Sequence, residues 1–437
     1  MKFENPPAYD ISELIFKDEI LIEEFFSKKY DDFFKSSNSR YLYWDELKHK
    51  KDLPFDPIKS WALLKLNRRS NYKKLTFGDF SFCYTLTELI QKDLHEFDLK
   101  LIGGLYKSPI TNFEKSEYLK NSLLEEAIAS SQIEGAATTT KVAWDMLKSG
   151  RKPRNESEQM IFNNLRGIKY IDEETQSSLD FRFIIEVHRI MTANTSAESC
   201  AGAFRESQIY VQDHVDGEIA HTPPEYEMVE GLMQELCDFV NQNTVFIHPI
   251  MKASIIHFMI GFIHPFKDGN GRTARALFYW YLLKKDYGLI KSISISRAIL
   301  DSRIQYEKAF LKTENDDNDL TYFIMYSIKS LRVAFESLVR YRDKKKEERE
   351  KSNLIAYKLI QKGLHKRQAD LIGYLCSKNT NRVNISSYSE KYDIVRQTAR
   401  KDLNDLEKLG FIEEEKIGRN IFFKLTSIEK VDAYLDA

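Results

Sequence analysis

The spacing of apolar residues constrains the fold of this chain most strongly. Through most of its 437 residues, apolar positions recur at the three- and four-residue intervals of an amphipathic helix, and only 17 glycines and 10 prolines interrupt them. This pattern favours a mainly α-helical protein. The chain is also longer than a single ordinary core supports, so we expect two or three domains.

Changes in composition divide the chain into three predicted regions. Residues 1–115 have a mixed pattern in which helical segments prevail, and residues 116–340 are dominated by helical spacing. The run RDKKKEEREK at 342–351 is almost wholly charged, as in a solvated helix or a linker. We therefore expect a domain boundary there, with residues 352–437 as a separate C-terminal domain.

The overall composition excludes several classes of protein. A formal net charge of −1 argues against a chain that is coated with nucleic acid, and the four cysteines include no CxxC pair, as a zinc motif would require. Such cysteines are typical of thiols in a reducing compartment. No apolar run approaches the length of a membrane span, and the first residues lack the pattern of a signal peptide. We therefore expect a soluble, cytoplasmic protein without a membrane partner.

The segment HPFKDGNGRTAR at 264–275 carries the strongest functional signal. It lies between two apolar helical segments, which predicts a tight loop that opens a helix. Gly269 and Gly271 let backbone amides approach a ligand, and the dipole of the helix favours an anion at this end. Arg272 and Arg275 lie on one face of the helix. The segment therefore predicts a phosphate-binding site.

Two further side chains of this loop extend its predicted chemistry. Asp268 suits a divalent cation, because Mg²⁺ is usually held by one or two carboxylates together with phosphate oxygens. His264 stands at the start of the loop, where it is placed to take a proton from an incoming hydroxyl. A helix precedes the glycines, which excludes a dinucleotide-binding fingerprint, and no Gly-Lys-Ser/Thr follows, which excludes a Walker loop. The combination suits a nucleoside triphosphate.

The loop resembles the Fic family signature HPFx(D/E)GNGRxxR and matches it at every fixed position. The resemblance covers roughly residues 116–340. It implies an all-helical domain with a small β-hairpin flap, which transfers AMP from ATP to a hydroxyl of a protein and releases diphosphate. It also implies that His264 is the general base and that Asp268 binds magnesium. The same resemblance assigns ATP binding to Asp268, Gly269, Asn270, Gly271, Arg272, Thr273, Ala274 and Arg275.

Gly271 distinguishes between two reactions of the family. Relatives that transfer a phosphoryl group carry lysine at this position, so the glycine favours transfer of AMP. Tyr306 resembles a family tyrosine that lines the nucleotide pocket, although Gln305 replaces the tyrosine that often precedes it in relatives. The alternative for Tyr306 is an ordinary packed aromatic residue of a helix.

A second match lies in SSQIEG at 130–135, which resembles the inhibitory motif (S/T)xxxE(G/N) of the family. Ser130 and Glu134 are one helical turn apart and share a face. The resemblance implies that Glu134 pairs with Arg275 and occupies the site of the γ-phosphate. The alternative is an ordinary helix that ends at Gly135, with the glutamate in solvent.

A short hairpin is predicted over about 209–222. Residues 207–211 alternate in polarity, and a turn at Asp216-Gly217 follows. In the family this position holds the flap, where a target peptide adds as an extra strand through backbone bonds. The predicted flap residues are Ile209, Tyr210 and Val211.

Residues from about 352 to 435 resemble a winged helix-turn-helix. The segment VRQTARKDLNDLEKLGFI is the predicted recognition helix, with Val395, Ala399, Leu403 and Leu406 on its buried side. The predicted exposed start of this helix consists of Arg396, Gln397, Thr398, Arg400 and Lys401. The segment from Lys351 onward has an excess of positive charge, which is a modest basic footprint. The fold does not decide between contact with DNA and contact with another protein, including a second copy in a homodimer.

The sequence as a whole therefore predicts an ATP- and Mg²⁺-dependent protein adenylyltransferase that is restrained by Glu134. Its target protein is unidentified, and the chain itself is one candidate. One alternative is an enzyme that removes AMP from modified proteins, since an intact inhibitory glutamate permits both directions. The other is a transcriptional regulator in which the Fic domain senses a nucleotide.

Overall fold

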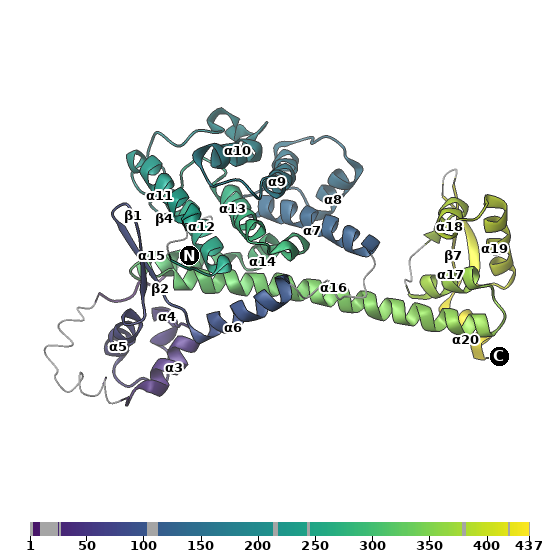
Figure 1. Cartoon of the computed structure of the whole chain (residues 1–437), viewed down its shortest axis with the longest axis horizontal. Coiled ribbons are helices and arrows are strands. Elements are labelled where there is room, and N and C mark those ends of the chain that lie inside the picture. Colours follow the sequence, from purple (N-terminus) through teal and green to yellow (C-terminus); the bar gives the residue numbers. More distant parts are fainter. Residues whose placement is uncertain are drawn as a thin grey trace. The chain divides into compact units, whose positions relative to one another are not determined.

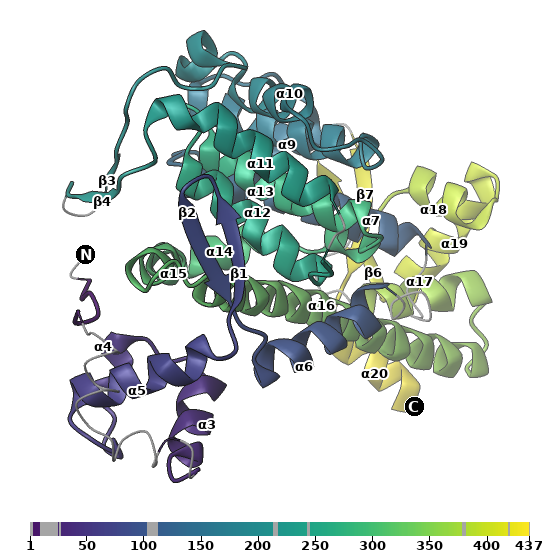
Figure 2. The same ribbon diagram turned by 60° about the vertical axis from the view of Figure 1, so that its left-hand side comes forward.

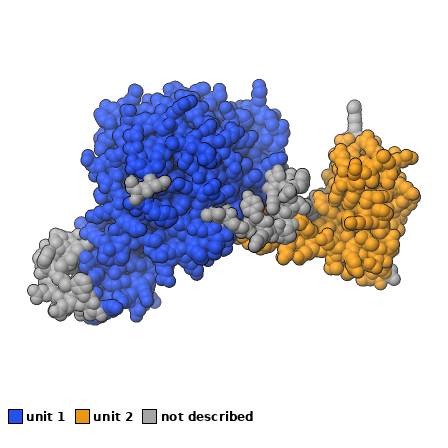
Figure 3. All heavy atoms as spheres, viewed as in Figure 1, with its two compact units in different colours: residues 1–108, 112–337 blue, residues 109–111, 338–437 orange. Residues whose placement is uncertain are grey.

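The structure is a computed structural model whose elements are mainly helices (Figure 1). It describes residues 3–8, 25, 28–102, 112–212, 217–242, 245–377, 382–417 and 420–436. The chain divides into two compact units, shown in two colours in Figure 3. Unit 1 comprises residues 1–108 and 112–337, and unit 2 comprises residues 109–111 and 338–437. The mainly α-helical fold class predicted from apolar spacing is confirmed.

The division between the units falls inside one helix. Helix α16 spans Thr321–Gln361, and the two units divide between residues 337 and 338. The charged run at 342–351 is therefore helical and lies within α16.

Unit 1 begins with short helices and a hairpin and continues into the helices around the loop at 264–275. Its N-terminal elements are α3 (Asp31–Ser39), α4 (Trp44–Leu47), α5 (Pro57–Arg69), β1 (Lys73–Phe77), β2 (Phe80–Tyr84), α6 (Glu88–Phe97) and η1 (Asp98–Ile102). The next elements are α7 (Asn112–Ile133), α8 (Thr140–Ser149), α9 (Glu156–Glu173), α10 (Phe181–Thr192), η2 (Ser196–Cys200), β3 (Val211–Gln212) and β4 (Ile219–His221). The last are η3 (Tyr226–Met228), α11 (Val229–Asn241), α12 (Pro249–Ile263), α13 (Asn270–Lys284), η4 (Gly288–Ser292), α14 (Ile295–Asp301), α15 (Arg303–Asn315) and the start of α16.

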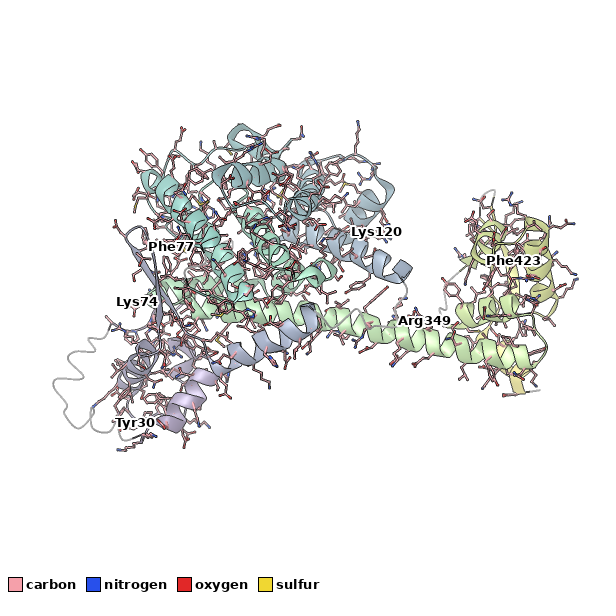
Figure 4. All side chains as sticks on the ribbon, viewed as in Figure 1. Tyr30, Lys74, Phe77, Lys120, Arg349 and Phe423 are labelled. Carbon is pink, nitrogen blue, oxygen red and sulfur yellow. The ribbon has the colours of Figure 1, made fainter. Side chains whose placement is uncertain are left out.

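The hairpin of β1 and β2 is an element that the sequence analysis did not predict. The strands pair antiparallel, with Phe77 opposite Phe80 across a two-residue turn. Gly78 in that turn has φ 55°, in the left-handed region that tight hairpin turns require. Phe77 is buried and Lys74 on the same strand is exposed (Figure 4). The sequence feature that could have predicted this hairpin is the Gly-Asp pair between two apolar runs.

Helices α12 and α13 form the centre of unit 1, and they lie side by side in Figures 1 and 2. Almost every residue of both helices is buried, charged and polar ones included. A helix buried on all sides needs neighbours on all sides, and α7, α9, α10 and α11 pack around this pair. The loop at 264–269 is therefore fixed between two immobile helices.

Unit 2 consists of the end of α16 and a small domain with a three-stranded sheet. Its elements are α17 (Lys366–Ser377), β5 (Arg382–Val383), α18 (Ile385–Tyr392), α19 (Arg396–Lys408), β6 (Ile412–Ile417), β7 (Asn420–Leu425) and α20 (Ile428–Asp436). The strands are antiparallel in the order β5-β7-β6, and Phe423 of β7 is buried in the core of the unit (Figure 4).

The buried side of α19 follows the prediction except at its first residue. Ala399, Leu403 and Leu406 are buried, as expected from their spacing. Val395 was expected among them, and this prediction is wrong, because its side chain is 70% exposed. The physical reason is that Val395 is the N-cap residue with an extended backbone, so it lies outside the helical face.

The cysteines and the helices bear on the expected compartment. Cys83, Cys200, Cys237 and Cys376 are all free thiols. Among the helices that the described residues form, none combines the length and the apolar character that crossing a bilayer demands.

Candidate active site

The loop between α12 and α13 owes its shape to two left-handed residues. His264 ends α12 with φ 49° and ψ 58°, and Gly269 precedes α13 with φ 82°. A Cβ atom on Gly269 would lie 3.1 Å from Thr192 and 3.2 Å from His188. Both its backbone conformation and this close approach therefore require glycine.

Asn270 closes the loop from within. Its Oδ1 accepts a hydrogen bond of 2.9 Å from the backbone N–H of Phe266, and its Nδ2 donates one of 2.7 Å to the Phe266 carbonyl. The side chain is buried. The family resemblance assigned Asn270 to ATP, whereas in the structure its side chain fixes the shape of the loop.

His188 of α10 supports the same loop and was missed by the sequence analysis. Its Nε2 lies 2.8 Å from the carbonyl oxygen of Asp268, and its Nδ1 accepts a bond of 3.1 Å from the N–H of Gly202. A carbonyl only accepts, so Nε2 carries the proton. The ring also stacks on Phe266 with centroids 3.7 Å apart. Burial lowers the pKa of His188 to about 4, which keeps the ring neutral.

His264 presents a basic nitrogen. Its Nδ1 lies 3.1 Å from the carbonyl oxygen of Gly261, so Nδ1 carries the proton and Nε2 keeps its lone pair. Burial lowers the pKa of His264 to about 4. The imidazole is therefore unprotonated at neutral pH, as a general base must be.

Arg275 is held by both ends of the predicted inhibitory motif. Its Nε donates to Ser130 Oγ at 2.9 Å, and its Nη2 donates to the Ser130 carbonyl at 2.8 Å. Its Nη1 lies 3.0 Å from Glu134 Oε1. Burial acts to raise the pKa of Glu134, but the Arg275 guanidinium outweighs it and holds that pKa below its usual value. The pair is therefore ionised.

Helix α7 ends two residues before Gly135. Its last residue is Ile133, and Gly135 follows with φ 92°. Glu134 therefore stands at the turn beyond the helix, with 26% of its side chain exposed.

Gly271 faces the carboxylate of Glu134. A Cβ atom at Gly271 would lie 2.2 Å from Glu134 Oε1 and 3.1 Å from Arg275 Nη1. Its φ is not positive, so space rather than backbone freedom requires the glycine. Any side chain here would displace the carboxylate.

Arg272 and Asp268 stand at the start of α13. Arg272 Nη1 donates to the Met191 carbonyl at 2.8 Å, and Nη2 lies 3.4 Å from Asp268 Oδ2. Within the described ranges, the buried Arg272 Nε and the Thr273 Oγ1 have no hydrogen-bond partner. Buried polar atoms normally have partners, so these orphans mark a place for a polar ligand.

The residues present fit a magnesium ion only in company with a nucleotide. No group of three or more His, Cys, Asp or Glu side chains that could hold a metal occurs among the residues that the structure describes. The Asp268 side chain is 52% exposed, and its Oδ1 accepts from the Gly269 N–H. One accessible carboxylate beside a phosphate site is the donor set that Mg²⁺ uses with nucleotides.

A pocket of about 210 Å³ opens beside the loop. Its lining includes Glu134, Val211, His264, Gly271, Ala274 and Tyr306. The loop, Glu134 and both strands of the predicted flap therefore meet at one cavity. Its volume is below the range of about 300–1,000 Å³ that is typical of small-molecule sites.

Tyr306 of α15 is a packed aromatic residue and also lines the pocket. Its ring lines the pocket and packs edge-on against Phe310, with centroids 5.3 Å apart. Its hydroxyl lies 2.9 Å from His257 Nε2. Burial lowers the pKa of His257 to about 3, so this neutral ring fixes the tyrosine at the pocket wall without adding charge.

The flap is shorter than predicted. Strands β3 and β4 pair antiparallel, with Val211 opposite His221 and a register shift after Val211. Ile209 and Tyr210 were expected in the strand, and this prediction is wrong. In this register Ile209 would face Pro223, which has no N–H to donate. The expected turn residue Asp216 lies outside the described residues.

His221 of β4 ties the flap to α12 and α15 and was not predicted. Its Nδ1 lies 2.7 Å from Glu314 Oε2, and its Nε2 lies 2.8 Å from the Phe262 carbonyl oxygen. Both partners accept, so both ring nitrogens carry protons. Burial acts to lower the pKa of His221, but the hydrogen bond to Glu314 raises it above its usual value. This positive ring in turn opposes protonation of His264.

Arg205 holds the end of α12 and was also missed. Its Nε donates to the His264 carbonyl at 2.9 Å, and its backbone N–H donates to the Pro265 carbonyl at 2.8 Å. Its Nη2 donates to the Pro224 carbonyl, just after the flap. The side chain thus fixes the catalytic loop and the flap to each other.

The part of the chain that contains this site is similar in sequence to known proteins. Residues 178–282 match the model of the Fic/DOC family. The chain is 28% identical over 209 residues to Protein adenylyltransferase Fic of Nematostella vectensis, which covers 46% of either protein. It is 35% identical over 105 residues to Protein adenylyltransferase fic-1 of Caenorhabditis elegans, which covers 24% of this chain and 19% of the relative. The chain thus spans less than half the length of these curated relatives.

The fold agrees with the family match. The crystal structure of a Fic family protein from Desulfovibrio desulfuricans G20 superimposes with a TM-score of 0.53 and 19% identity, over 79% of this chain and 98% of that one. The matched residues run from just before α10 through the flap and the catalytic loop to near the end of α13. Residues 178–282, which contain the loop at 264–269, therefore resemble a Fic domain in sequence, and the fold agrees with that resemblance.

Proposed function

We propose that the Fic domain transfers AMP from ATP to a hydroxyl side chain of a protein. The observation that carries this proposal is that His264, with a free Nε2, lines one pocket together with Gly271 at the N-terminus of α13 and Glu134, the ion-pair partner of Arg275. Several curated relatives are named protein adenylyltransferases, which supports the same activity.

In the proposed reaction one residue acts as the base, and several other groups bind the phosphates of ATP. His264 Nε2 takes the proton of the target hydroxyl, and the hydroxyl oxygen forms a bond to the α-phosphorus of ATP. The bond from that phosphorus to the bridging oxygen breaks, and diphosphate leaves with the electron pair. The amides at the start of α13 and the Arg272 guanidinium stabilise the phosphate charge.

Asp268 is the residue that we propose to hold Mg²⁺. Its carboxylate is accessible and stands 3.4 Å from Arg272, at the edge of the phosphate site. When bound, the ion would supply positive charge to the phosphate oxygens.

The same site contains its own restraint. Arg275 makes one ion pair and two hydrogen bonds to Glu134 and Ser130, so its guanidinium is occupied before ATP arrives. We propose that this autoinhibition ends when Glu134 leaves Arg275 free for the γ-phosphate. The target protein, which includes the chain itself, would dock at the flap through Val211 and Gln212.

We further propose that unit 2 is a winged helix-turn-helix domain. Its order of α17, β5, α18, α19, β6 and β7 and its antiparallel three-stranded sheet support this assignment. The start of α19 exposes Arg396, Arg400 and Lys401, a basic edge that suits DNA phosphates. The proposed contact is confined to α19, because β6 carries glutamates at 413–415. Loss of a promoter-DNA shift at physiological salt in Arg400→Ala is the expected result, and an unchanged shift would contradict it.

The free thiols support a reducing compartment, and we propose a cytoplasmic location. The proposed activity is tested by incubating the full chain with α-labelled ATP and cell lysate. Label on protein is expected with wild type, more with Glu134→Gly, and none with His264→Ala. If the chain releases AMP from labelled protein and incorporates none, the result would instead support the alternative function, an enzyme that removes AMP from modified proteins.

A further inference from the structure

A second cavity in unit 1 lies on the other side of α15 from the catalytic pocket. Its volume is about 560 Å³, within the range of about 300–1,000 Å³ that is typical of small-molecule sites. The wall comes from α6, α15, the first part of α16 and residues 40–46. Figures 1 and 2 show α15 beside the start of α16.

Helix α15 separates the two cavities. Lys308, Ala309 and Lys312 line this second cavity, whereas Tyr306 and Phe310 line the catalytic pocket. These sets lie on opposite sides of one helix, so each cavity has its own wall. A substitution in the wall of one cavity can therefore show whether a ligand binds there or in the other cavity.

Three tyrosines give the second cavity an aromatic wall. The hydroxyl of Tyr41 donates to Asp319 at 2.6 Å, and that of Tyr322 donates to Asp316 at 2.8 Å. The hydroxyl of Tyr326 lies 2.9 Å from Ser302 Oγ. These polar ends are engaged elsewhere, and Tyr41 and Tyr322 are buried, so the half-buried ring of Tyr326 is what the wall offers to a ligand.

The charges around the cavity do not balance. Its wall includes six Lys or Arg residues and three carboxylates. Arg332 pairs with Asp93 and Glu96, and Lys312 pairs with Glu46.

The excess positive charge comes from three lysines on three helices. Lys92 is on α6, Lys308 on α15 and Lys329 on α16. Over the ranges that the structure describes, none of the three makes an ion pair. Like charges that converge on one concave wall repel each other, and an anion between them removes that repulsion.

We propose that this cavity binds a small anion that carries a planar ring and two or three negative charges, such as a nucleoside phosphate. The ring lies against Tyr326, as aromatic surfaces favour. The phosphates face Lys92, Lys308 and Lys329 through charge-assisted hydrogen bonds. The site is additional to the catalytic one, and it shares none of its residues.

The test measures binding of ADP to the full chain by calorimetry, with hydrogen exchange to locate it. ADP is expected to protect α6 and the start of α16. The variant Lys308→Gln/Lys329→Gln should weaken this binding about 10- to 100-fold, because each lost contact to a charged group is worth about 1.5–3 kcal/mol. The variant Lys74→Gln/Lys141→Gln, with two exposed lysines elsewhere in unit 1, should bind like wild type.

Arg275→Ala separates the new site from the catalytic pocket. Protection of α6 and α16 should persist in this variant, because the partners of Arg275, which are Ser130 and Glu134, do not line the second cavity. Adenosine and inorganic diphosphate should each bind more weakly than ADP. Adenosine has the planar ring but no phosphates, and diphosphate has the phosphates but no ring. Binding that requires Arg275 and ignores the two lysines, or no protection of α6 and α16 at millimolar ADP, would overturn the proposal.

Discussion

Arg275 Nη1 lies 3.0 Å from Glu134 Oε1, while two other nitrogens of the same guanidinium bind Ser130. The arginine is 3% exposed, so this pair has little competition from water. Coulomb attraction is stronger in such surroundings than at a surface. A ligand phosphate that binds Arg275 must therefore displace a carboxylate that is already well placed.

Removal of the Glu134 carboxylate is expected to raise activity. Glu134→Gly frees Arg275, and ATP phosphates then take a productive position, where a misplacement of about 1 Å can change a rate by about 10²-fold. Glu134→Asp keeps the charge with a shorter reach, so it should release only part of the inhibition. Incorporation of labelled AMP at saturating ATP is the measurement.

Arg275→Ala is the matched control for this prediction. It breaks the inhibitory pair but also removes the γ-phosphate contact, so it should stay inactive alone and together with Glu134→Gly. Equal rates for wild type and Glu134→Gly would refute the inhibitory role.

His264→Ala is expected to abolish transfer while the fold and ATP binding persist. Loss of a general base typically lowers a rate by about 10²–10⁴-fold. Labelling and thermal unfolding are measured on the same preparation. Nearby His188→Phe is not an equivalent change, because His188 faces the loop backbone rather than the pocket. Labelling at the wild-type rate by His264→Ala would exclude its role as base.

His221 is expected to make the stability of the flap depend on pH. Its pKa is raised in the folded protein from an ordinary value of 6.5, so its contribution is full below pH 6.5. That contribution is lost as the pH rises through the folded pKa, where the bond to Glu314 or Phe262 loses its proton. The melting temperatures of wild type and His221→Gln should differ most at low pH and converge at high pH. A constant difference from pH 5 to 9 would contradict the doubly protonated ring.

His188→Phe is expected to destabilise the loop although it keeps a ring against Phe266. The change removes the donor to the Asp268 carbonyl and the acceptor for Gly202 N–H. A buried polar group left without a partner costs about 1–3 kcal/mol. Urea unfolding measures the loss, and His95→Phe, an exposed histidine of α6, is the control. Equal stability of His188→Phe and wild type would show that the stack alone holds the loop.

The sequence by itself determined the helical class and the catalytic loop. The loop is a contiguous segment, so its residue types and their order limit its chemistry before the chain folds. The spacing of Ser130 and Glu134 predicts a shared helical face, but α7 ends at Ile133, so the turn beyond the helix is what brings Glu134 to Arg275. The position of Tyr306 at the pocket came from resemblance, and the structure places it there.

The tertiary structure decided which distant residues support that loop. His188, Arg205 and His221 carry no local motif, and their partners are carbonyl and carboxylate oxygens that only packing brings near. It also decided the length of the flap, since Pro223 ends the pairing only in the register that the folded chain adopts. Local spacing predicts the face of a helix, but hydrogen bonds between segments depend on where the whole core places them.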